Sequence, residues 1–262
     1  MRVALMIEGQ EGVSWEQWVA LARAAEDAKL DALFRSDHYR SIGRGDPNGS
    51  LDAWTTLAGL AALTTTIRLG TLVSPVTFRP ASVLAKSVTT VDHISGGRVE
   101  LGIGAGWYEA EHDTYGFPFL TQRGRLDELD RQLDEITGQW TDADDVWPKP
   151  VQQPRPPLIV GGRAKPRTVA AAVKHADEYN TVLPTLDEAR EWKARVDQAA
   201  HEAGREPLRF SAMLKLEGSE QELEERLHAY AGVGLDRVMM QHLAHEQLEP
   251  VAMLGELAAR LR

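Results

Sequence analysis

The sequence contains no cysteine among its 262 residues. Disulfide bonds, thiolate metal sites and cysteine nucleophiles are therefore excluded, and the cytoplasm is the expected location. The chain also lacks any run of about 18 consecutive apolar residues, so we expect no transmembrane helix. Its first residues turn acidic too early for a signal peptide, and we expect them to form a strand.

Positive charge is scarce relative to negative charge. The chain has 29 Lys and Arg against 39 Asp and Glu, which gives a formal net charge of −10. Nucleic-acid binding needs a cationic surface that displaces counterions, so no nucleic-acid partner is expected. Histidine spacings of the H-x-H or H-E-x-x-H kind are absent, and no metal site is predicted. The G-x-S-x-G elbow of serine hydrolases is absent as well.

What the chain does contain is a regular alternation of strand-like and helix-like segments. Apolar runs typical of buried strands occupy Arg2–Glu8, Asp31–Asp37, Ile67–Val73, Arg98–Gly104, Leu158–Val160, Glu178–Leu183, Leu208–Leu216 and Leu235–Gln241. Helical patterns occupy Ser14–Lys29, Leu51–Thr64, Ala81–Ile94, Arg123–Trp140, Pro166–His175, Leu186–Ala203, Ser219–Ala231 and Glu246–Leu261. Eight such units predict an α/β fold of the (β/α)8 TIM-barrel type, with an open doubly wound sheet as the alternative.

One stretch interrupts the alternation. Thr141–Pro157 is rich in proline, which lacks the amide donor and fixes φ, so an extended connector is predicted. A linker between two domains is the other interpretation. Neither half of the chain differs in composition, however, and the alternation resumes at Leu158. We therefore expect a single domain over residues 1–262.

The carboxyl ends of barrel strands share one face, which is where barrel enzymes carry out chemistry. Asp37 and His38 end the second predicted strand, and an imidazole at that position can move a proton near neutral pH. A buried histidine that only hydrogen-bonds its neighbours is the alternative. A hydrolase that uses Asp37 and His38 around a metal also stays open.

A glycine-rich run, Gly102-Ile-Gly-Ala-Gly-Trp-Tyr108, ends the fourth predicted strand. It does not fit the dinucleotide-binding pattern G-x-G-x-x-G, because Trp107 and Glu109 stand where a final glycine is required. We interpret the glycines as giving main-chain amides access to a flat ring or a phosphate. Steric relief in a crowded barrel interior is the alternative interpretation.

A second candidate loop follows the fifth predicted strand. That strand ends at Gly161 and Gly162, and a helix begins near Pro166, a residue well suited to the first helical position. The free amides of a helix start, together with the clustered Arg163, Lys165 and Arg167, predict an anion site suited to phosphate. A solvated basic turn is the alternative.

Five segments carry a resemblance to a known family: Ser36–His38, Leu69–Pro80, Val91–Trp107, Tyr115–Phe117 and Ile159–Gly162. They resemble the bacterial-luciferase-like flavin and deazaflavin oxidoreductases, and within them the branch that depends on coenzyme F420. The resemblance implies an eight-stranded α/β barrel that holds a flat ring in its mouth. It also implies a cis peptide bulge at Leu72–Val73 behind the ring, and His38 near the reactive ring carbon.

The resemblance also assigns the remaining site residues. The cofactor site is expected to comprise Asp37, Leu72, Val73, Gly104, Ala105, Gly106, Trp107, Gly161, Gly162 and Arg163. Sugar-phosphate dehydrogenases of this family carry a glutamate where this chain has Trp107. We therefore expect Trp107 and Tyr108 to shape the site of a more apolar substrate.

The expected function is hydride transfer between coenzyme F420 and a small organic substrate, with His38 handling one proton. A homodimer is the assembly that the resemblance implies. An FMN-dependent monooxygenase of the same superfamily is the alternative function. A non-catalytic cofactor-binding protein is a third.

Overall fold

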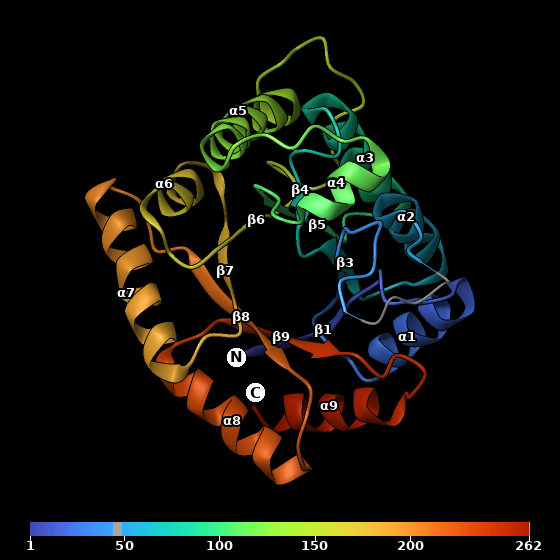
Figure 1. Cartoon of the computed structure of the whole chain (residues 1–262). Coiled ribbons are helices and arrows are strands. Elements are labelled where there is room, and N and C mark those ends of the chain that lie inside the picture. Colours follow the sequence, from blue (N-terminus) through green and yellow to red (C-terminus); the bar gives the residue numbers. More distant parts are fainter. Residues whose placement is uncertain (44–48, 262) are drawn as a thin grey trace.

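The computed structural model describes residues 1–43 and 49–261, in which helices surround a ring of parallel strands (Figure 1). The strands are β1 (Arg2–Ile7), β2 (Ala32–Arg35), β3 (Arg68–Thr71), β4 (Ser74–Pro75), β5 (Val99–Gly104), β6 (Leu158–Gly161), β7 (Glu178–Val182), β8 (Arg209–Lys215) and β9 (Arg237–His242). The helices are α1 (Trp15–Asp27), α2 (Ala53–Leu63), α3 (Ala81–Ser95), α4 (Glu109–Tyr115), α5 (Gln122–Thr141), α6 (Pro166–His175), α7 (Leu186–Glu202), α8 (Glu220–Val233) and α9 (Glu249–Arg260).

The sheet closes on itself. Its order is β3-β2-β1-β9-β8-β7-β6-β5-β4, and β3 also pairs in parallel with β5. β3 and β4 are two parts of one barrel strand, interrupted at Leu72 and Val73, whose peptide bond is cis. The predicted eight-fold barrel is confirmed, and the open sheet is excluded. Strands before and after Thr141–Pro157 pair within this one sheet.

Local sequence rules account for several helix starts. Ser14 accepts a hydrogen bond from the amide of Gln17, whose side chain in turn accepts one from the amide of Ser14, so Ser14 caps α1. Thr185 and Glu188 form the same reciprocal capping arrangement at the start of α7. Pro166 opens α6 at its first turn, as predicted.

Alternation along the strands sorts side chains between two environments. In β1, Leu5 and Ile7 belong to the large apolar cluster between strands and helices, whereas Ala4 and Met6 belong to a second cluster inside the barrel. That interior layer consists of Ala4, Met6, Ala32, Phe34, Leu72, Ile159, Met213 and Met239. Glu8 follows Ala4 and Met6 on the same side of the chain, and its side chain lies at the open carboxyl end of the barrel.

Beneath the apolar layer, at the amino ends of the strands, lies a buried ionic cluster centred on Arg237. Its guanidinium is 2.8 Å from a carboxylate oxygen of Glu100, 2.7 Å from one of Glu178 and 3.0 Å from one of Asp31. Burial by itself raises the pKa of Glu100, but the charges of Arg237 and Arg68 and the hydrogen bonds that they donate together hold that pKa below its usual range. The cluster fills the amino end of the barrel, and the opposite end holds a cavity.

We predict that Arg237→Met lowers the free energy of unfolding by about 3–5 kcal/mol, because it leaves Glu100 and Glu178 buried without their central counter-ion. Urea unfolding followed by circular dichroism measures the loss. Arg131→Met is the matched control, since Arg131 forms its ion pairs on the surface and its removal costs less than about 1 kcal/mol. Equal losses in the two variants would contradict this view of the cluster.

Candidate active site

A cavity of about 360 Å³ lies at the carboxyl ends of the strands. Its lining comprises Glu8, Ser36, His38, Ile42, Leu72, Val73, Pro75, Phe78, Gly104, Ala105, Gly106, Trp107, Tyr108, Glu111, His112, Gly161, Gly162, Asn180, Val182 and Met213. The structure thus brings together the predicted bulge, both predicted glycine loops, His38, Trp107 and Tyr108. Two other predicted cofactor residues, Asp37 and Arg163, are not part of this lining.

The glycines around the bulge differ in how close their neighbours lie. A Cβ on Gly102 would lie 2.1 Å from the carbonyl oxygen of Thr71, and one on Gly104 would lie 2.7 Å from a methyl group of Val73. These two positions let β5 pass close to the bulge. A Cβ on Gly161 would lie 3.5 Å from Val73, which is ordinary contact. Gly161 therefore leaves open space in the cavity that the fold itself does not require.

His38 is held by a carboxylate that the sequence did not reveal. Its Nδ1 lies 2.8 Å from Oε2 of Glu111, a residue that is fully buried. The other carboxylate oxygen of Glu111 accepts hydrogen bonds from the amides of Tyr39, at 2.5 Å, and Arg40, at 3.2 Å. A carboxylate on Nδ1 places a proton on that nitrogen, which leaves Nε2 as the proton-exchanging atom.

Two aromatic rings accompany His38 at the cavity. The ring centroids of Trp107 and Tyr108 lie 6.0 and 6.3 Å from that of the imidazole, both nearly edge-on to it. Trp107 is 61% exposed and so stands at the rim of the cavity. The two residues predicted for the substrate side thus lie beside the predicted proton carrier.

Glu111 comes from α4, a helix that the sequence analysis did not predict. Figure 1 shows α4 inside the ring of outer helices, next to β4 and β5. The signals for it were present but short: Glu109 and Glu111 in the first turn, and Gly116 in the left-handed conformation at the C-cap. His112 on the same helix bonds Thr77 through Nε2 and the carbonyl of Tyr108 through Nδ1, which fixes α4 over the cavity.

Asp37 is buried next to the cavity rather than in its wall. Its carboxylate accepts hydrogen bonds from the Arg79 guanidinium at 2.7 and 3.2 Å and from the Ser74 hydroxyl at 2.6 Å. The partners of Asp37 and His38 are therefore different, and their polar atoms do not converge on one site. Among the described residues, no group of three or more His, Cys, Asp or Glu side chains could hold a metal ion.

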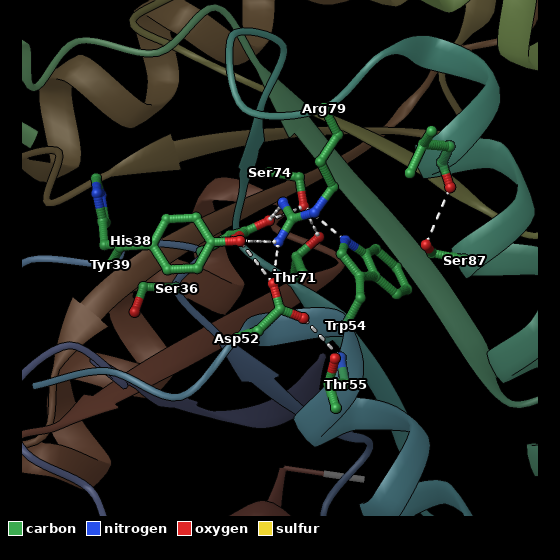
Figure 2. A network of polar contacts seen from close by, with 12 residues as sticks. Ser36, His38, Tyr39, Asp52, Trp54, Thr55, Thr71, Ser74, Arg79 and Ser87 are labelled. Atoms are coloured by element: carbon green, nitrogen blue, oxygen red, sulfur yellow. Dashed lines mark hydrogen bonds and ion pairs between the residues drawn. The ribbon is translucent and has the colours of Figure 1, made fainter. Parts of the chain in front are cut away.

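The same guanidinium binds two further residues near His38. Its Nη2 is 2.5 Å from Asp52 and 2.9 Å from the hydroxyl of Tyr39, which itself donates to Asp52 at 2.6 Å (Figure 2). Burial raises the pKa of Tyr39, and the hydrogen bond to Asp52 adds to that rise. Burial by itself raises the pKa of Asp52, but hydrogen bonds from Tyr39 and Thr55 and the charge of Arg79 hold it well below its usual range.

The two loops predicted to bind an anion differ in the donors and cations that they present. The backbone amides of Ala105, Gly106 and Trp107 have no acceptor among residues 1–43 and 49–261. In the other loop, Arg163 is exposed outside the cavity, and Arg167 pairs with Asp127 and Asp130 of α5.

In that second loop, Gly161 and Gly162 reach the cavity, but the amides of Gly162 and Ala164 are already bonded to the carbonyl of Asn180 and the hydroxyl of Tyr179. The clustered cations are therefore not assembled into one cavity site. The Ala105–Trp107 amides are the freer donors for an anion.

Glu8 places a second carboxylate at the cavity, and sequence reasoning missed it too. Its two oxygens accept hydrogen bonds from the side-chain amides of Gln10, at 3.0 Å, and Gln241, at 2.6 Å. Those amides orient the carboxylate without neutralising it. Among the described residues that line the cavity, none is Lys or Arg.

Comparison with known proteins identifies the family. The sequence profile of the family described as Luciferase-like monooxygenase matches residues 1–260, so the chain belongs to this family. An uncharacterised Mycobacterium bovis protein, Mb0978c, is 30% identical over 253 residues, which cover 91% of this chain and 83% of that protein. Pyrimidine monooxygenase RutA from Cronobacter turicensis is 26% identical and covers 71% of this chain and 54% of that protein.

Solved structures of low sequence identity share the fold. An F420-dependent secondary alcohol dehydrogenase in complex with an F420-acetone adduct superposes with a TM-score of 0.84 at 14% identity, covering 100% of this chain and 99% of that one. The oxygenating constituent of 3,6-diketocamphane monooxygenase from Pseudomonas putida, in complex with FMN, gives 0.79 at 17% identity, covering 98% and 96%. The protein is thus a luciferase-like oxidoreductase, in a fold that accommodates either cofactor. None of the described helices is long and apolar enough to cross a membrane.

Proposed function

We propose that this protein transfers a hydride between coenzyme F420 and a small, uncharged organic substrate. The observation that carries the proposal is the single cavity that joins the Leu72–Val73 bulge to the His38–Glu111 pair. One wall is shaped to support a flat ring, and another carries an oriented proton carrier. The sequence resemblance to the F420-dependent branch is what favours the deazaflavin over FMN.

The residues of the cavity fit a bound ring. The volume falls within the range of about 300–1,000 Å³ typical of ligand sites. Leu72 and Val73 supply an apolar wall, and Gly161 leaves room beside Val73 that a larger residue would fill. In our proposal the acceptor-free amides of Ala105–Trp107 hold the phosphate, with Arg163 near the exposed end of the tail and Asp37 supporting the site from below.

The proposed chemistry divides between cofactor and protein. When bound, the deazaflavin supplies or accepts the hydride. His38 then gives a proton to the substrate heteroatom in reduction, or removes it in oxidation, through the Nε2 that Glu111 leaves free. Glu111 determines which imidazole nitrogen exchanges the proton, and it fixes the orientation of the imidazole ring.

The charge of the cavity bears on the substrate. Glu8 and Glu111 line it, and neither Lys nor Arg does among the described residues. An anionic substrate would be repelled there, whereas Trp107 and Tyr108 offer aromatic surface. This supports an uncharged, partly apolar substrate and speaks against a sugar phosphate. The proposal also keeps the homodimer and the cytoplasmic location that the sequence led us to expect.

A fluorescence titration of the cofactor-free protein with F420 and with FMN tests the proposal. We expect F420 to bind at least 10-fold more tightly and then to exchange hydride with a member of a ketone, imine and enone panel. FMN binding that is 10-fold tighter would favour an FMN-dependent monooxygenase, since FMN is the cofactor found in the 3,6-diketocamphane monooxygenase structure. If neither cofactor bound, the proposed function would be wrong.

Gly161→Ala should weaken F420 binding at least 10-fold while leaving the melting temperature unchanged. The added methyl makes only ordinary contact with Val73, yet it enters the space assigned to the ring. Gly138→Ala in α5 is the matched control, because a Cβ there meets nothing within 4 Å and Gly138 does not line the cavity that holds His38. Unchanged F420 affinity in Gly161→Ala would show that the ring does not occupy the space beside Gly161.

We expect His38→Ala to lower kcat about 100-fold or more, since a positioned proton carrier contributes roughly that much. The dissociation constant for F420 should change less than threefold, because the imidazole transfers a proton and does not hold the deazaflavin ring. His228→Ala is the control, as His228 is exposed on α8. Parallel losses in kcat and in cofactor affinity would contradict the assigned role.

A further inference from the structure

A partly buried polar network connects two parts of the site that come from different strands. Five side chains form it: Asp37, Tyr39, Asp52, Ser74 and Arg79, here called the Arg79 network. Figure 2 shows the Arg79 guanidinium between Tyr39, Asp52 and Ser74, while His38 points away from it. Arg79 is not among the residues that line the cavity, so it has no direct access to a ligand there.

Residues of the Arg79 network adjoin both His38 and the bulge in the chain. Asp37 and Tyr39 are the two neighbours of His38 in sequence. Ser74 directly follows the Leu72–Val73 bulge. The hydrogen bond from Ser74 to Asp37 therefore joins the strand end that carries His38 to the strand break that carries the bulge.

The surroundings make this connection stiff. Asp37 and Ser74 are 1% and 0% exposed, and the indole of Trp54 donates to the Ser74 hydroxyl at 3.0 Å. Arg79 offers a planar fork that binds Asp37 with two nitrogens and reaches Asp52 with one of them. The buried Asp37 and Ser74 therefore resist rearrangement, because any shift there leaves an unpaired polar group.

We propose that the Arg79 network is a positioning device, which fixes the His38 imidazole relative to the Leu72–Val73 bulge and so sets the geometry between proton carrier and ring. This inference rests on the proposed function of the cavity. Arg79, Ser74 and Tyr39 are positioning residues in this scheme, since they act through His38 and the bulge and touch neither substrate nor cofactor.

A double-mutant cycle tests the proposal. In single-turnover hydride transfer with F420 and the best acceptor of the panel, Ser74→Ala should slow the reaction at least 10-fold, with less than a threefold change in F420 affinity. In the His38→Ala background the same change should slow it less than twofold, because nothing then remains to be positioned. An equal loss in both backgrounds would overturn the proposal.

Tyr39→Phe provides a second, milder variant that keeps the aromatic packing and removes only one hydroxyl. It should slow hydride transfer at least threefold, again only when His38 is present. Arg98→Met is the matched control: Arg98 also makes several partly buried hydrogen bonds, to Thr64 and nearby carbonyls, but at the other end of the barrel. It should lower the melting temperature without altering the transfer rate.

A readout without cofactor separates this inference from the proposed function. In the cofactor-free protein, Ser74→Ala should shift the imidazole 15N resonances of His38 and leave those of His228 in place. Arg98→Met should shift neither. Unmoved His38 resonances in Ser74→Ala would refute the positioning role even if F420 binds and reacts. Failure of the wild-type protein to bind either cofactor would refute the function and leave this NMR result standing.

Discussion

The hydrogen bond between the His38 imidazole and the Glu111 carboxylate is the interaction on which this site depends. Glu111 is fully buried, and an ionised carboxylate there is tolerated only because several donors surround it. Those donors are the His38 ring and the amides of Tyr39 and Arg40. One carboxylate thus fixes both the ring and the loop that carries it, and it decides which imidazole nitrogen meets the cavity.

The barrel supplies this pair with a rigid surrounding. Its interior is layered: the Arg237 cluster closes the amino end, an apolar layer fills the middle, and the cavity occupies the carboxyl end. Side chains alternate between the two sides of a strand. Met6 and Phe34 point into the barrel interior. Glu8, Ser36 and His38 follow them on the same side and lie at the open end. The Arg79 network then ties the His38 segment to the bulge that interrupts the neighbouring strand.

The sequence predicted the fold well, because the signals for it are local and repeated eight times. Strand-end position makes His38 a candidate for proton transfer, with a buried structural histidine as the alternative, and the family resemblance favours the first. Glycine at strand ends marks Gly104 and Gly161. The family resemblance is what predicts Asp37 in the cofactor site. The alternation continues past the end of β2, however, and directs Asp37 to the opposite side, where it meets Arg79.

Other parts of the site could not be predicted in the same way. Glu111 lies 73 residues from His38 in the chain, on a seven-residue helix too short to give a clear periodicity. Glu8 looked like the last residue of a strand, and only the closed barrel shows that it faces the cavity. The cationic loop at Arg163 is predicted as a phosphate site, with a solvated basic turn as the alternative, and the sequence does not reveal the ion pairs of Arg167 with α5 because they depend on tertiary packing.

The most direct test of this account is the tautomer of His38 in the cofactor-free protein, measured by long-range 1H–15N NMR at a pH where the ring is neutral. We expect a proton on Nδ1, hydrogen-bonded to Glu111, and an unprotonated Nε2 facing the cavity. In Glu111→Gln this preference should be lost. A wild-type ring protonated on Nε2 in its neutral form would contradict the central claim.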